Sequence, residues 1–416
     1  MRLIRKIIPA PLLSAYHFCV AHLAAIRYGF PSKKLLVIAV TGTKGKSSVT
    51  EMVNAILETA GYKTIVLNSI RFKIGKHTEP NLTRMSTPGR FFIQRSLAKA
   101  LKAGCTAAVL ELTSEGARQH RHRAIELDAL IFTNLAPEHI ESHGSYEAYG
   151  NAKFEIGKQL ARSKKRPRII VANGDDSQSA RYLSLPVEKR IRYSLSRLEH
   201  YEAGTRGGHI KFDGVDIAIK LPGEFSLKNA LAAATLCQAL DIDTETIARG
   251  IASLTRIPGR GEHIDAGQSF SVVVDYAHTP GSLQALYDSF PRSRKICILG
   301  NTGGGRDKWK RPVMGKIADE SCDVVYLTNE DPYNEDPHAI VEEMATGMKR
   351  TPTIIMDRRL AIRDAISKAG PGDAVLISGK GTDPCICVEK GKKIPWSDAS
   401  VAREELALLA SQQELY

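Results

Sequence analysis

The sequence predicts an α/β protein: a domain with a phosphate-binding loop on a doubly wound, mostly parallel sheet, followed by a second, Rossmann-like α/β domain. Two observations support this prediction. Short apolar runs alternate with stretches whose apolar residues recur three and four positions apart. A glycine-containing segment, TGTKGKSS at 41–48, directly follows the first apolar run and precedes a helical stretch. The length of 416 residues also exceeds one compact core.

The expected elements follow in chain order. Buried strands are predicted at 35–40, 64–67, 107–112, 129–133 and 168–173, and a hairpin at 208–221, where residues alternate around Asp213-Gly214. After the phosphate loop, one helix face is formed by Val49, Met52, Val53, Ile56 and Leu57. A second series has strands at 271–275, 295–300, 323–328, 353–356 and 373–378. We place the seam near Arg256–Gly259, which gives an N-terminal segment 1–34, a central domain 35–256 and a C-terminal domain 257–416.

The N-terminal segment has a basic start and an uncharged stretch from Ile7 to Ile26, which a signal peptide or membrane span could also show. Two prolines and two histidines interrupt that stretch, and the phosphate loop follows almost at once. We therefore expect residues 11–28 to form an amphipathic helix docked on the next domain. The expected protein is cytoplasmic, without membrane attachment, and monomeric.

Charge and cysteine content limit the function class. The net charge of +13 and the pI near 9.3 suit anionic partners. Because no zinc-finger, RNP-type or heptad pattern is present, small anions such as nucleotides are favoured over nucleic acid. The seven cysteines are scattered, and Cys385 and Cys387 are too close together for a structural zinc pair. This usage predicts a reducing compartment and no disulfide framework.

The phosphate loop departs from the full Walker A pattern, because Val40 stands where the first glycine would be. The shorter Gly42-Thr-Lys-Gly45-Lys46-Ser47 still lets backbone N–H groups turn toward an anion at a helix N-terminus. Lys46 would reach the β- and γ-phosphates, and the Ser47 hydroxyl would bind Mg²⁺. The alternative is a simple turn with a solvated lysine. Kinase, GTPase and ligase all remain open on this motif alone.

Polar residues follow two later strands. Glu111 ends the run at 107–112, and Glu138, His139 and Lys153 follow the run at 129–133. Ligands bind at the carboxyl ends of strands in doubly wound sheets, so these groups could converge on a metal. Taken singly, each would more often be a solvated surface residue. The run RQHRHR at 118–123 resembles a metal motif, but its arginines favour a solvated basic turn.

Nine ordered motifs between Leu35 and Ala402 resemble those of Mur ligases: TGTKGKSS, ELTS, FTNLAPEHIESHGSYEAYGNAK, LPGEFSLKNALAAA, IPGRGE, VDYAHTP, GNTGGGRDKWKRPVMG, TNEDPYNEDP and ISGKG. The elements DYAHTP, RDKWKRPVMG and GKG are most similar to the branch that adds the third amino acid, the UDP-N-acetylmuramoyl-tripeptide synthetases. Folylpolyglutamate synthetase shares the Thr-Lys-Gly-Lys loop, but the later motifs do not suit it.

The resemblance implies an ATP-dependent carboxylate–amine ligase of peptidoglycan precursor synthesis that works through an acyl phosphate and requires Mg²⁺. Lys46 and Ser47 would hold the γ-phosphate and the first Mg²⁺, while Glu111 and His139 would hold the second. Lys153 matches the family's carbamylated lysine, an oxygen ligand for that metal. The two Mg²⁺ ions would screen the repulsion between the γ-phosphate and the acceptor carboxylate, which must come together for the reaction. The implied catalytic set is thus Lys46, Glu111, His139 and Lys153.

The resemblance also assigns substrate contacts. ATP would contact Gly42, Thr43, Lys44, Gly45, Ser48, Asn229, Arg260, Asp275 and His278. The acceptor would meet Thr87, Thr113 and Ser114. The amino acid would meet Arg306, whose guanidinium suits an α-carboxylate, and Glu330, Asp331, Tyr333, Gly379 and Asp383.

Several positions depart from the family pattern. Lys44 stands for a usual asparagine, Glu115 for a usual histidine, and the paired-asparagine signature reads Ser226-Leu-Lys-Asn229. Only about 35 residues precede the loop, where tripeptide synthetases carry a domain that grips UDP. The N-terminal helix could replace that domain, UDP recognition could be weak, or the acceptor could be another cell-wall peptide or a glutamyl chain. A non-catalytic nucleotide-binding homologue is the remaining alternative.

The amino-acid pocket differs from that of diaminopimelate-adding relatives, where an Asp-Asn-Pro-Arg motif supplies an arginine for the distal carboxylate. Here Tyr333 replaces that arginine, and Glu330, Asp331 and Asp383 face the side-chain end. Three carboxylates without a second arginine predict lysine or ornithine over diaminopimelate. Alternatively, Glu330 and Asp331 only cap the helix that begins near Glu335.

Overall fold

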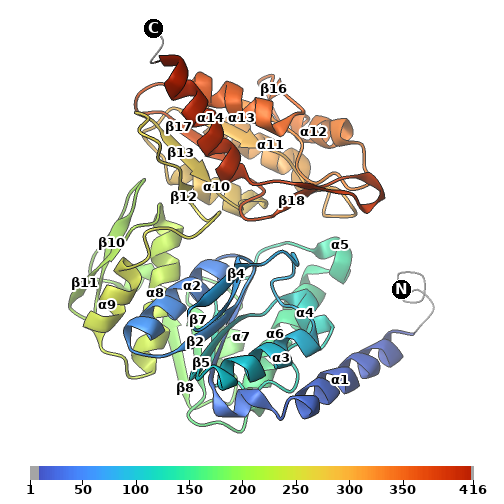
Figure 1. The fold of residues 1–416 in the computed structure, drawn as a ribbon, viewed down its shortest axis with the longest axis vertical. Helices are drawn as coiled ribbons and strands as arrows, with labels where there is room; N and C mark the ends of the chain where they lie inside the picture. The colour runs from blue at the N-terminus through green and yellow to red at the C-terminus, as the bar shows by residue number, and fades with distance from the viewer. Residues whose placement is uncertain (1–8, 414–416) are drawn as a thin grey trace.

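The computed structural model describes residues 9–413, and within them two α/β domains lie one above the other (Figure 1). Residues 1–8 of the expected N-terminal segment and residues 414–416 lie outside the described part. The central domain holds an eight-stranded sheet in the order β4-β3-β2-β5-β1-β6-β7-β8, in which β3 pairs antiparallel with both β2 and β4 and all other neighbouring strands are parallel. Its strands are β1 Leu36–Thr41, β2 Thr64–Leu67, β3 Arg71–Ile74, β4 His77–Pro80, β5 Ala107–Glu111, β6 Ala129–Phe132, β7 Ile169–Asn173 and β8 Lys189–Tyr193.

This sheet is buried on both faces, which explains why its central strands are continuous apolar runs. In β1, Ile38 and Val40 face one core, while Val37 and Ala39 face the other. The first core packs against α2, α8 and α9, and the second against α3, α6 and α7. The helices of this domain are α2 Lys46–Thr59, α3 Arg90–Lys102, α4 Ser114–Arg118, α5 Ile140–His143, α6 Tyr146–Arg162, α7 Ser179–Leu183, α8 Glu224–Ala239 and α9 Thr244–Ala252.

A small antiparallel sheet, in the order β11-β10-β9, flanks the central domain. It comprises β9 Tyr201–Ala203, β10 Gly208–Phe212 and β11 Val215–Ile219, with the predicted turn at Asp213-Gly214. Ile210 and Phe212 of β10 join the core beneath α8, so the alternate residues of that strand face outward. α9, the last helix of the central domain, ends at Ala252, and β12, the first strand of the C-terminal sheet, begins at Glu262. The predicted domain boundary near 256–259 lies between them.

The C-terminal domain holds a six-stranded sheet in the order β12-β13-β17-β14-β15-β16, parallel except for β12. Its strands are β12 Glu262–His263, β13 Ser271–Val274, β14 Lys295–Leu299, β15 Val324–Leu327, β16 Thr353–Ile354 and β17 Ala374–Ile377. α13 Arg358–Ser367 and α14 Asp398–Gln413 cover one face; α10 Pro280–Asp288, α11 Lys310–Ser321 and α12 Pro337–Ala345 cover the other. A two-stranded hairpin, β18 Cys385–Cys387 with β19 Lys393–Pro395, completes the domain. The predicted fold class is confirmed.

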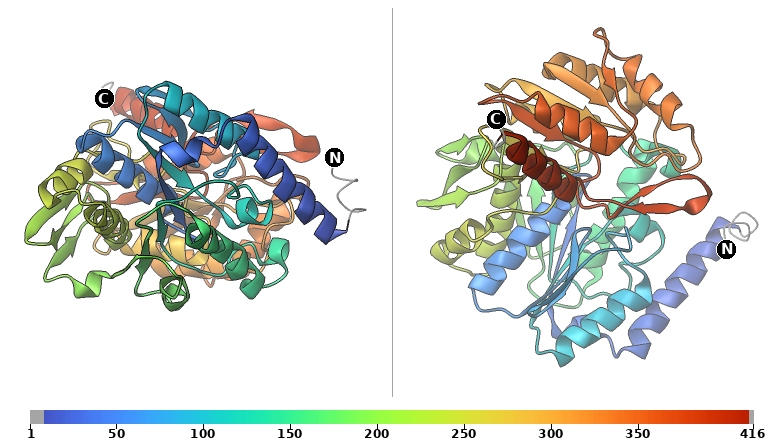
Figure 2. Two further views of the ribbon diagram at one scale, coloured as in Figure 1. Left: turned by 90° about the horizontal axis from the view of Figure 1, so that it is seen from below. Right: turned by 45° about the horizontal axis from the view of Figure 1, so that its top comes forward.

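The N-terminal helix α1, Ala10–Arg27, packs beside α3 on the outside of the central domain (Figures 1 and 2). Its docking face is small, with Ala21, Ala24 and Ala25 buried. The predicted amphipathic character is wrong, because the outer face is also apolar: Leu12 is 63% exposed and Ile26 61% exposed. No helix among the described residues has the length and apolar composition to cross a membrane.

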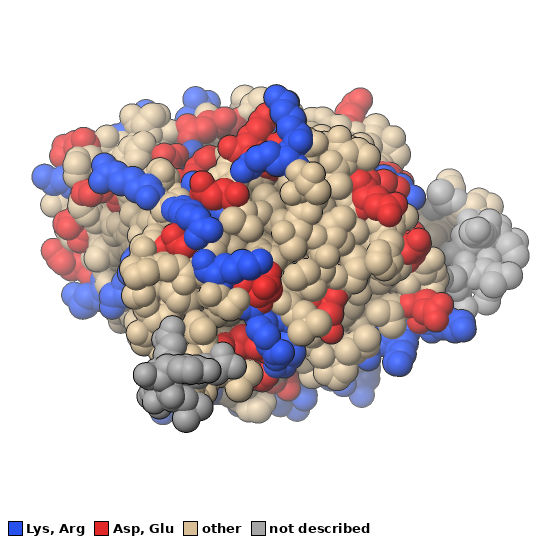
Figure 3. Space-filling model, turned by 90° about the horizontal axis from the view of Figure 1, so that it is seen from above, with Lys and Arg blue, Asp and Glu red and all other residues tan. Residues whose placement is uncertain are grey.

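The described part of the chain contains one disulfide, although the scattered cysteines predicted no disulfide framework. Cys297 on β14 and Cys322, just after α11, are joined by a disulfide, because the parallel strands bring the end of α11 back beside β14. The described residues Cys19, Cys105, Cys237, Cys385 and Cys387 are free. On the face of the C-terminal domain drawn in Figure 3, basic side chains stand among acidic ones, so that face presents no continuous basic patch.

Candidate active site between the two domains

The phosphate loop connects β1 to α2 and requires glycine at two positions. Gly42 has a φ of 145°, and a Cβ there would lie 1.9 Å from Thr133 Oγ1. Gly45 has a φ of 80° as the N-cap of α2, and a Cβ there would lie 2.4 Å from Asn229 Oδ1. The Thr43 amide donates to the Asn134 carbonyl, which fixes the loop on the next strand connection. The first N–H groups of α2 then point outward, where they can hold an anion.

Lys46, Ser47 and Glu111 meet at this loop. Lys46 Nζ donates to the Thr43 carbonyl at 2.9 Å and lies 4.0 Å from Glu111 Oε1. The Ser47 hydroxyl donates to Glu111 Oε2 at 2.8 Å. Burial lowers the pKa of Lys46, and the nearby Glu111 partly opposes that shift. A buried hydroxyl beside a buried carboxylate provides two oxygen ligands of the kind that Mg²⁺ prefers.

Lys153 reaches the same loop from α6. Its side chain is buried, and Nζ donates to the Gly42 carbonyl at 2.5 Å while lying 4.7 Å from the centre of the Tyr149 ring. Burial and the neighbouring Lys46 lower the pKa of Lys153 well below its usual value. It is therefore not a surface lysine paired with Glu147 or Glu155, the alternative environment for a helix lysine of this sequence.

His139 and Glu138 follow β6 on the loop before α5. Burial, followed by the charges of Arg306 and Lys153, lowers the pKa of His139 to about 3, so the imidazole is neutral and can accept a metal ion. Glu138 is buried, with one oxygen 3.3 Å from Lys310 Nζ and the other without a partner among the described groups. Burial raises the pKa of Glu138 despite Lys310.

The residues just before β12 and just after β13 add a cationic and an aromatic side chain. Arg260 lies over the Tyr276 ring, 4.4 Å from its centre, and donates to the Ser69 hydroxyl at 3.1 Å. Asp275 Oδ2 accepts from the Gly261 amide at 2.6 Å, so this carboxylate holds the Arg260 turn in place. Burial lowers the pKa of His278 well below its usual value.

The expected acceptor-binding residues form a tight local network. The Thr87 hydroxyl donates to the Glu111 carbonyl at 2.9 Å and lies 3.1 Å from the Thr113 hydroxyl, which caps α4. Ser114 is buried at the start of α4. These side chains lie directly beside Glu111, but each hydroxyl of the two threonines already has a protein partner.

The C-terminal domain brings Arg306 to the opposite side of the cleft. Arg306 is exposed, makes no ion pair with another described residue, and its charge acts on His139 and Glu138. The neighbouring Asp307 accepts from the backbone amides of Ile140 and Glu141 at 3.3 and 3.0 Å. The Arg306 loop is thereby attached to the loop that carries His139.

The carboxylates expected around the side chain of the incoming amino acid are paired with a lysine and with a second arginine, Arg84. The expectation of a pocket without a second arginine is therefore wrong. Asp331 accepts from Lys380 Nζ at 2.8 Å and from Arg84 at 2.5 Å. The same Arg84 nitrogen lies 2.9 Å from Asp383. Glu330 is buried beneath Gly379 and accepts from Thr302, and burial raises its pKa. Its role is therefore not that of a helix cap.

Comparison with known proteins decides the family. The Mur ligase middle domain matches residues 40–237, and the domain described as "Mur ligase, glutamate ligase domain" matches residues 259–381. The chain belongs to the Mur ligase family. As a Mur ligase it is an ATP-dependent amide ligase, of the kind that serves peptidoglycan precursor synthesis, and the family predicted from the motifs is confirmed.

Relatives of this Mur ligase include a UDP-N-acetylmuramyl-tripeptide synthetase from Roseiflexus sp. (strain RS-1), 36% identical over 97% of this chain and 84% of that protein. A solved UDP-N-acetylmuramoyl-L-alanyl-D-glutamate–2,6-diaminopimelate ligase is 27% identical with a TM-score of 0.61, covering 90% of this chain and 79% of the other. A Mycobacterium tuberculosis folylpolyglutamate synthase complexed with ADP has a TM-score of 0.72 over 90% of this chain and 93% of its own, but at 18% identity it shows the fold alone.

Two residues of this Mur ligase site were not identified from the sequence. Arg84 lies on the loop between β4 and α3, far along the chain from Asp331, and no local pattern indicates the contact. Lys310 is buried and joins Glu138 of the central domain to the His278 carbonyl at 3.0 Å. It lies within the RDKWKRP motif, but it is the fold that distinguishes this buried lysine from the exposed Lys308.

We expect Lys44 to make nucleotide binding by this Mur ligase depend on pH. Burial lowers the pKa of Lys44 to about 8, with Glu138 partly opposing the shift. An ammonium group attracts phosphates and a neutral amine does not, so ATP binding to the free protein should weaken as pH rises through about 8. We expect kcat/KM for ATP to fall roughly tenfold between pH 7 and 9.5. Lys44→Arg should flatten that profile because its charge persists; the same fall in the variant would contradict the assignment to Lys44.

Proposed function

We propose that this protein joins an amino acid to the carboxylate of a UDP-N-acetylmuramoyl-dipeptide-like acceptor, with ATP converting that carboxylate into an acyl phosphate. The observation that carries the proposal is the convergence of Lys46, Ser47 and Glu111 with Lys153 and His139 around one loop, opposite Arg306. In the proposed division, the central domain, 35–256, binds ATP, and the C-terminal domain, 257–416, binds the amino acid. Within the N-terminal segment 1–34, helix α1 packs on the outside of the central domain.

The positive charges around the phosphate loop would allow the ATP phosphates to approach the acceptor carboxylate. Lys46 and Arg260 would hold the phosphoryl group, and the α2 amides would hold the other phosphates. Asn229, which lies against Gly45, and His278 would contact the nucleotide, as would the backbone of Thr43 and the side chain of Ser48. Lys46 is hydrogen-bonded to the Thr43 carbonyl and Arg260 to the Ser69 hydroxyl before substrate enters, so these two cations need little rearrangement during transfer.

The residues present fit magnesium. Ser47 and Glu111 offer paired oxygens, His139 is neutral, and the partnerless oxygen of buried Glu138 indicates room for a further cation nearby. Ser47 would hold one Mg²⁺, and Glu111, His139 and Lys153 the other. The ions would screen charge between the phosphate and the acceptor carboxylate. Thr87, Thr113 and Ser114 border the place where that carboxylate would lie.

Lys153 would serve as a carbamate. Burial lowers the pKa of Lys153 and so favours its neutral amine, the form that adds to CO₂. The product is an anionic oxygen ligand, which suits a metal far better than an ammonium does. Because Lys153 Nζ points at the phosphate loop, a carbamate there would add its oxygens beside Ser47 and Glu111.

Arg306 would bind the α-carboxylate of the incoming amino acid, since its exposed guanidinium makes no ion pair with another described residue and its charge acts on His139 and Glu138. The attacking amine would then approach the acyl phosphate from the C-terminal domain. The side-chain end would be lined by Tyr333, Asp383 and Gly379, with Asp331 behind them. The contacts of Asp307 with the His139 loop would fix the distance between the two reacting groups.

Arg84 would set the choice among diamino acids. With Arg84 and Lys380 opposite Asp331 and Asp383, the pocket end carries balanced charge rather than three unpaired carboxylates. A balanced end accommodates the zwitterionic distal group of diaminopimelate better than a purely anionic one would, so the expected preference for lysine or ornithine is reduced. Arg84→Ala should raise the ratio of kcat/KM for lysine to that for diaminopimelate at least tenfold.

The control for Arg84 is Arg84→Lys, which keeps the positive charge and should leave that ratio within a few-fold of the wild-type value. If Arg84→Ala leaves the ratio unchanged while activity persists, Arg84 only holds the two domains together and takes no part in selectivity.

The experiment that tests the proposed function is a panel assay of phosphate release. Muropeptide acceptors with and without the UDP group, and a glutamyl acceptor, are each combined with ATP, Mg²⁺ and lysine, ornithine or diaminopimelate. We expect release that depends on both the muropeptide acceptor and the amino acid. Release with the glutamyl acceptor alone, or release with none of the acceptors, would contradict the proposal.

A further inference from the structure

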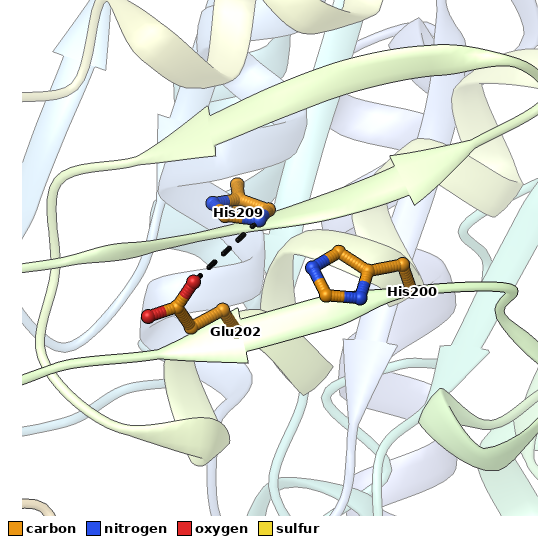
Figure 4. A group of neighbouring side chains, drawn as sticks. All are labelled: His200, Glu202 and His209. Carbon is orange, nitrogen blue, oxygen red and sulfur yellow. Dashed lines mark ion pairs between the residues drawn. The ribbon is translucent and has the colours of Figure 1, made fainter.

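Three potential metal ligands lie together on the small sheet, away from the catalytic cleft. His200 precedes β9, Glu202 lies on β9 and His209 lies on β10 (Figure 4). One ligand atom from each residue lies within 4.8 Å of the other two. His209 Nε2 is 4.0 Å from Glu202 Oε2, and the two imidazole rings are 5.3 Å apart.

The strand register explains why these side chains share one face. His209 pairs directly with Glu202, and His200 stands two residues before Glu202, immediately ahead of β9, where its carbonyl accepts from the Lys211 amide and so continues the pairing with β10. Residues two apart on a strand, and residues paired across it, point to the same side of a sheet. The opposite side carries Ile210 and Phe212 into the core, so the three polar residues face solvent.

The charges around the cluster favour a cation. Besides Glu202, this part of the sheet presents Glu199 and Asp216. Its lysines are Lys211, which lies 3.8 Å from Glu199 and pairs with Asp216 in the register, and the exposed Lys220, two residues beyond the Ala218 that pairs with His209. The acidic side chains thus outnumber the ammonium groups beside the two imidazoles. A divalent ion would relieve this excess of negative charge.

We propose that His200, Glu202 and His209 form a binding site for a divalent transition-metal ion of the Zn²⁺ or Ni²⁺ type. Two imidazoles and one carboxylate make a ligand set for such ions, whereas Mg²⁺ prefers oxygen ligands alone. Ligand atoms around a tetrahedral ion lie roughly 3.3 Å apart, given bonds of about 2.0–2.1 Å. The Glu202 side chain is 73% exposed and that of His209 is 33% exposed, so rotation about χ1 and χ2 can close that difference.

The proposed site would have a structural role. It would connect β9 to β10 beside the turn at 204–207, whose Thr205 carbonyl lies 2.8 Å from His263 Nε2 and whose Arg206 pairs with Asp265. His263 and Asp265 belong to the C-terminal domain. A bound ion would therefore stabilise the sheet that contacts the start of that domain.

The test uses the full chain after removal of any histidine tag, with Zn²⁺ and Ni²⁺ titrated calorimetrically in excess Mg²⁺, so that oxygen-rich sites are already filled. We expect the wild type to bind one equivalent more than His209→Ala, and the affinity of that site to fall at least tenfold in Glu202→Gln. The matched control is His77→Ala, which removes an exposed strand histidine outside the cluster and should bind as the wild type does.

Ligase activity and metal binding are both measured on each variant, so that loss of the metal site can be told apart from misfolding. Ligase activity without added transition metal should be unchanged in His209→Ala and Glu202→Gln, which shows that the variants fold. If both variants then bind Zn²⁺ and Ni²⁺ with wild-type stoichiometry and affinity, the ions bind elsewhere and the proposed site is wrong.

Discussion

Replacement of Lys46 by alanine should reduce turnover at least ~100-fold, the typical effect of removing one preorganised charge from a reacting group. Lys46 is half-buried at the start of α2, 4.0 Å from Glu111 and hydrogen-bonded to the Thr43 carbonyl, so its ammonium is held in place before ATP arrives. The measurement is amino-acid-dependent phosphate release at saturating substrates.

The control for Lys46 is Lys102→Ala, which removes an exposed lysine at the end of α3 and should leave turnover unchanged. ATP affinity should fall less than turnover in Lys46→Ala, because the transferring phosphoryl group gains charge only during reaction. Near-normal ligation by this variant would rule out the proposed phosphate site.

Replacement of Lys153 by alanine should abolish nearly all activity, and short carboxylic acids such as formate or acetate should restore part of it. The cavity left beside the Gly42 carbonyl and the Tyr149 ring would admit a small carboxylate, whose oxygens would stand in for those of the carbamate. Removal of dissolved CO₂ and bicarbonate should also lower wild-type activity reversibly.

Lys153→Arg distinguishes two possible roles of Lys153, a carbamate that binds metal and a simple positive charge. A guanidinium keeps the positive charge but does not add CO₂. We expect this variant to be inactive and not rescued by formate. Wild-type-like activity of Lys153→Arg would show that Lys153 acts as a cation rather than as a carbamate.

Much of the fold was predictable because the central strands are buried on both faces and therefore read as short apolar runs. The strands predicted at 35–40 and 129–133 correspond to β1 Leu36–Thr41 and β6 Ala129–Phe132. The edge strands β4 and β8 were missed because their sequences, HTEP and KRIRY, are largely polar. Strands at a sheet edge need bury only part of their surface, so hydrophobic periodicity is weak there.

The residues of the phosphate loop were predictable because sequence neighbours form it, but contacts between the domains were not. Arg84 and Asp331 are 247 positions apart, and only the packing of the β4–α3 loop against the C-terminal domain brings them together. The outer face of α1 was predicted as polar, yet composition alone does not show which apolar residues are buried. The Cys297–Cys322 disulfide likewise depends on the folded position of α11.

The central claim, that ATP activates the acceptor as an acyl phosphate, is tested most directly by isotope transfer. The acceptor is labelled with ¹⁸O in both oxygens of its reacting carboxylate, and the phosphate released during ligation is analysed by mass spectrometry. Attack of that carboxylate on the γ-phosphorus, followed by amine attack on the carbonyl carbon, leaves one labelled oxygen in each phosphate. The account predicts one ¹⁸O per phosphate formed; unlabelled phosphate accompanying ligated product would contradict it.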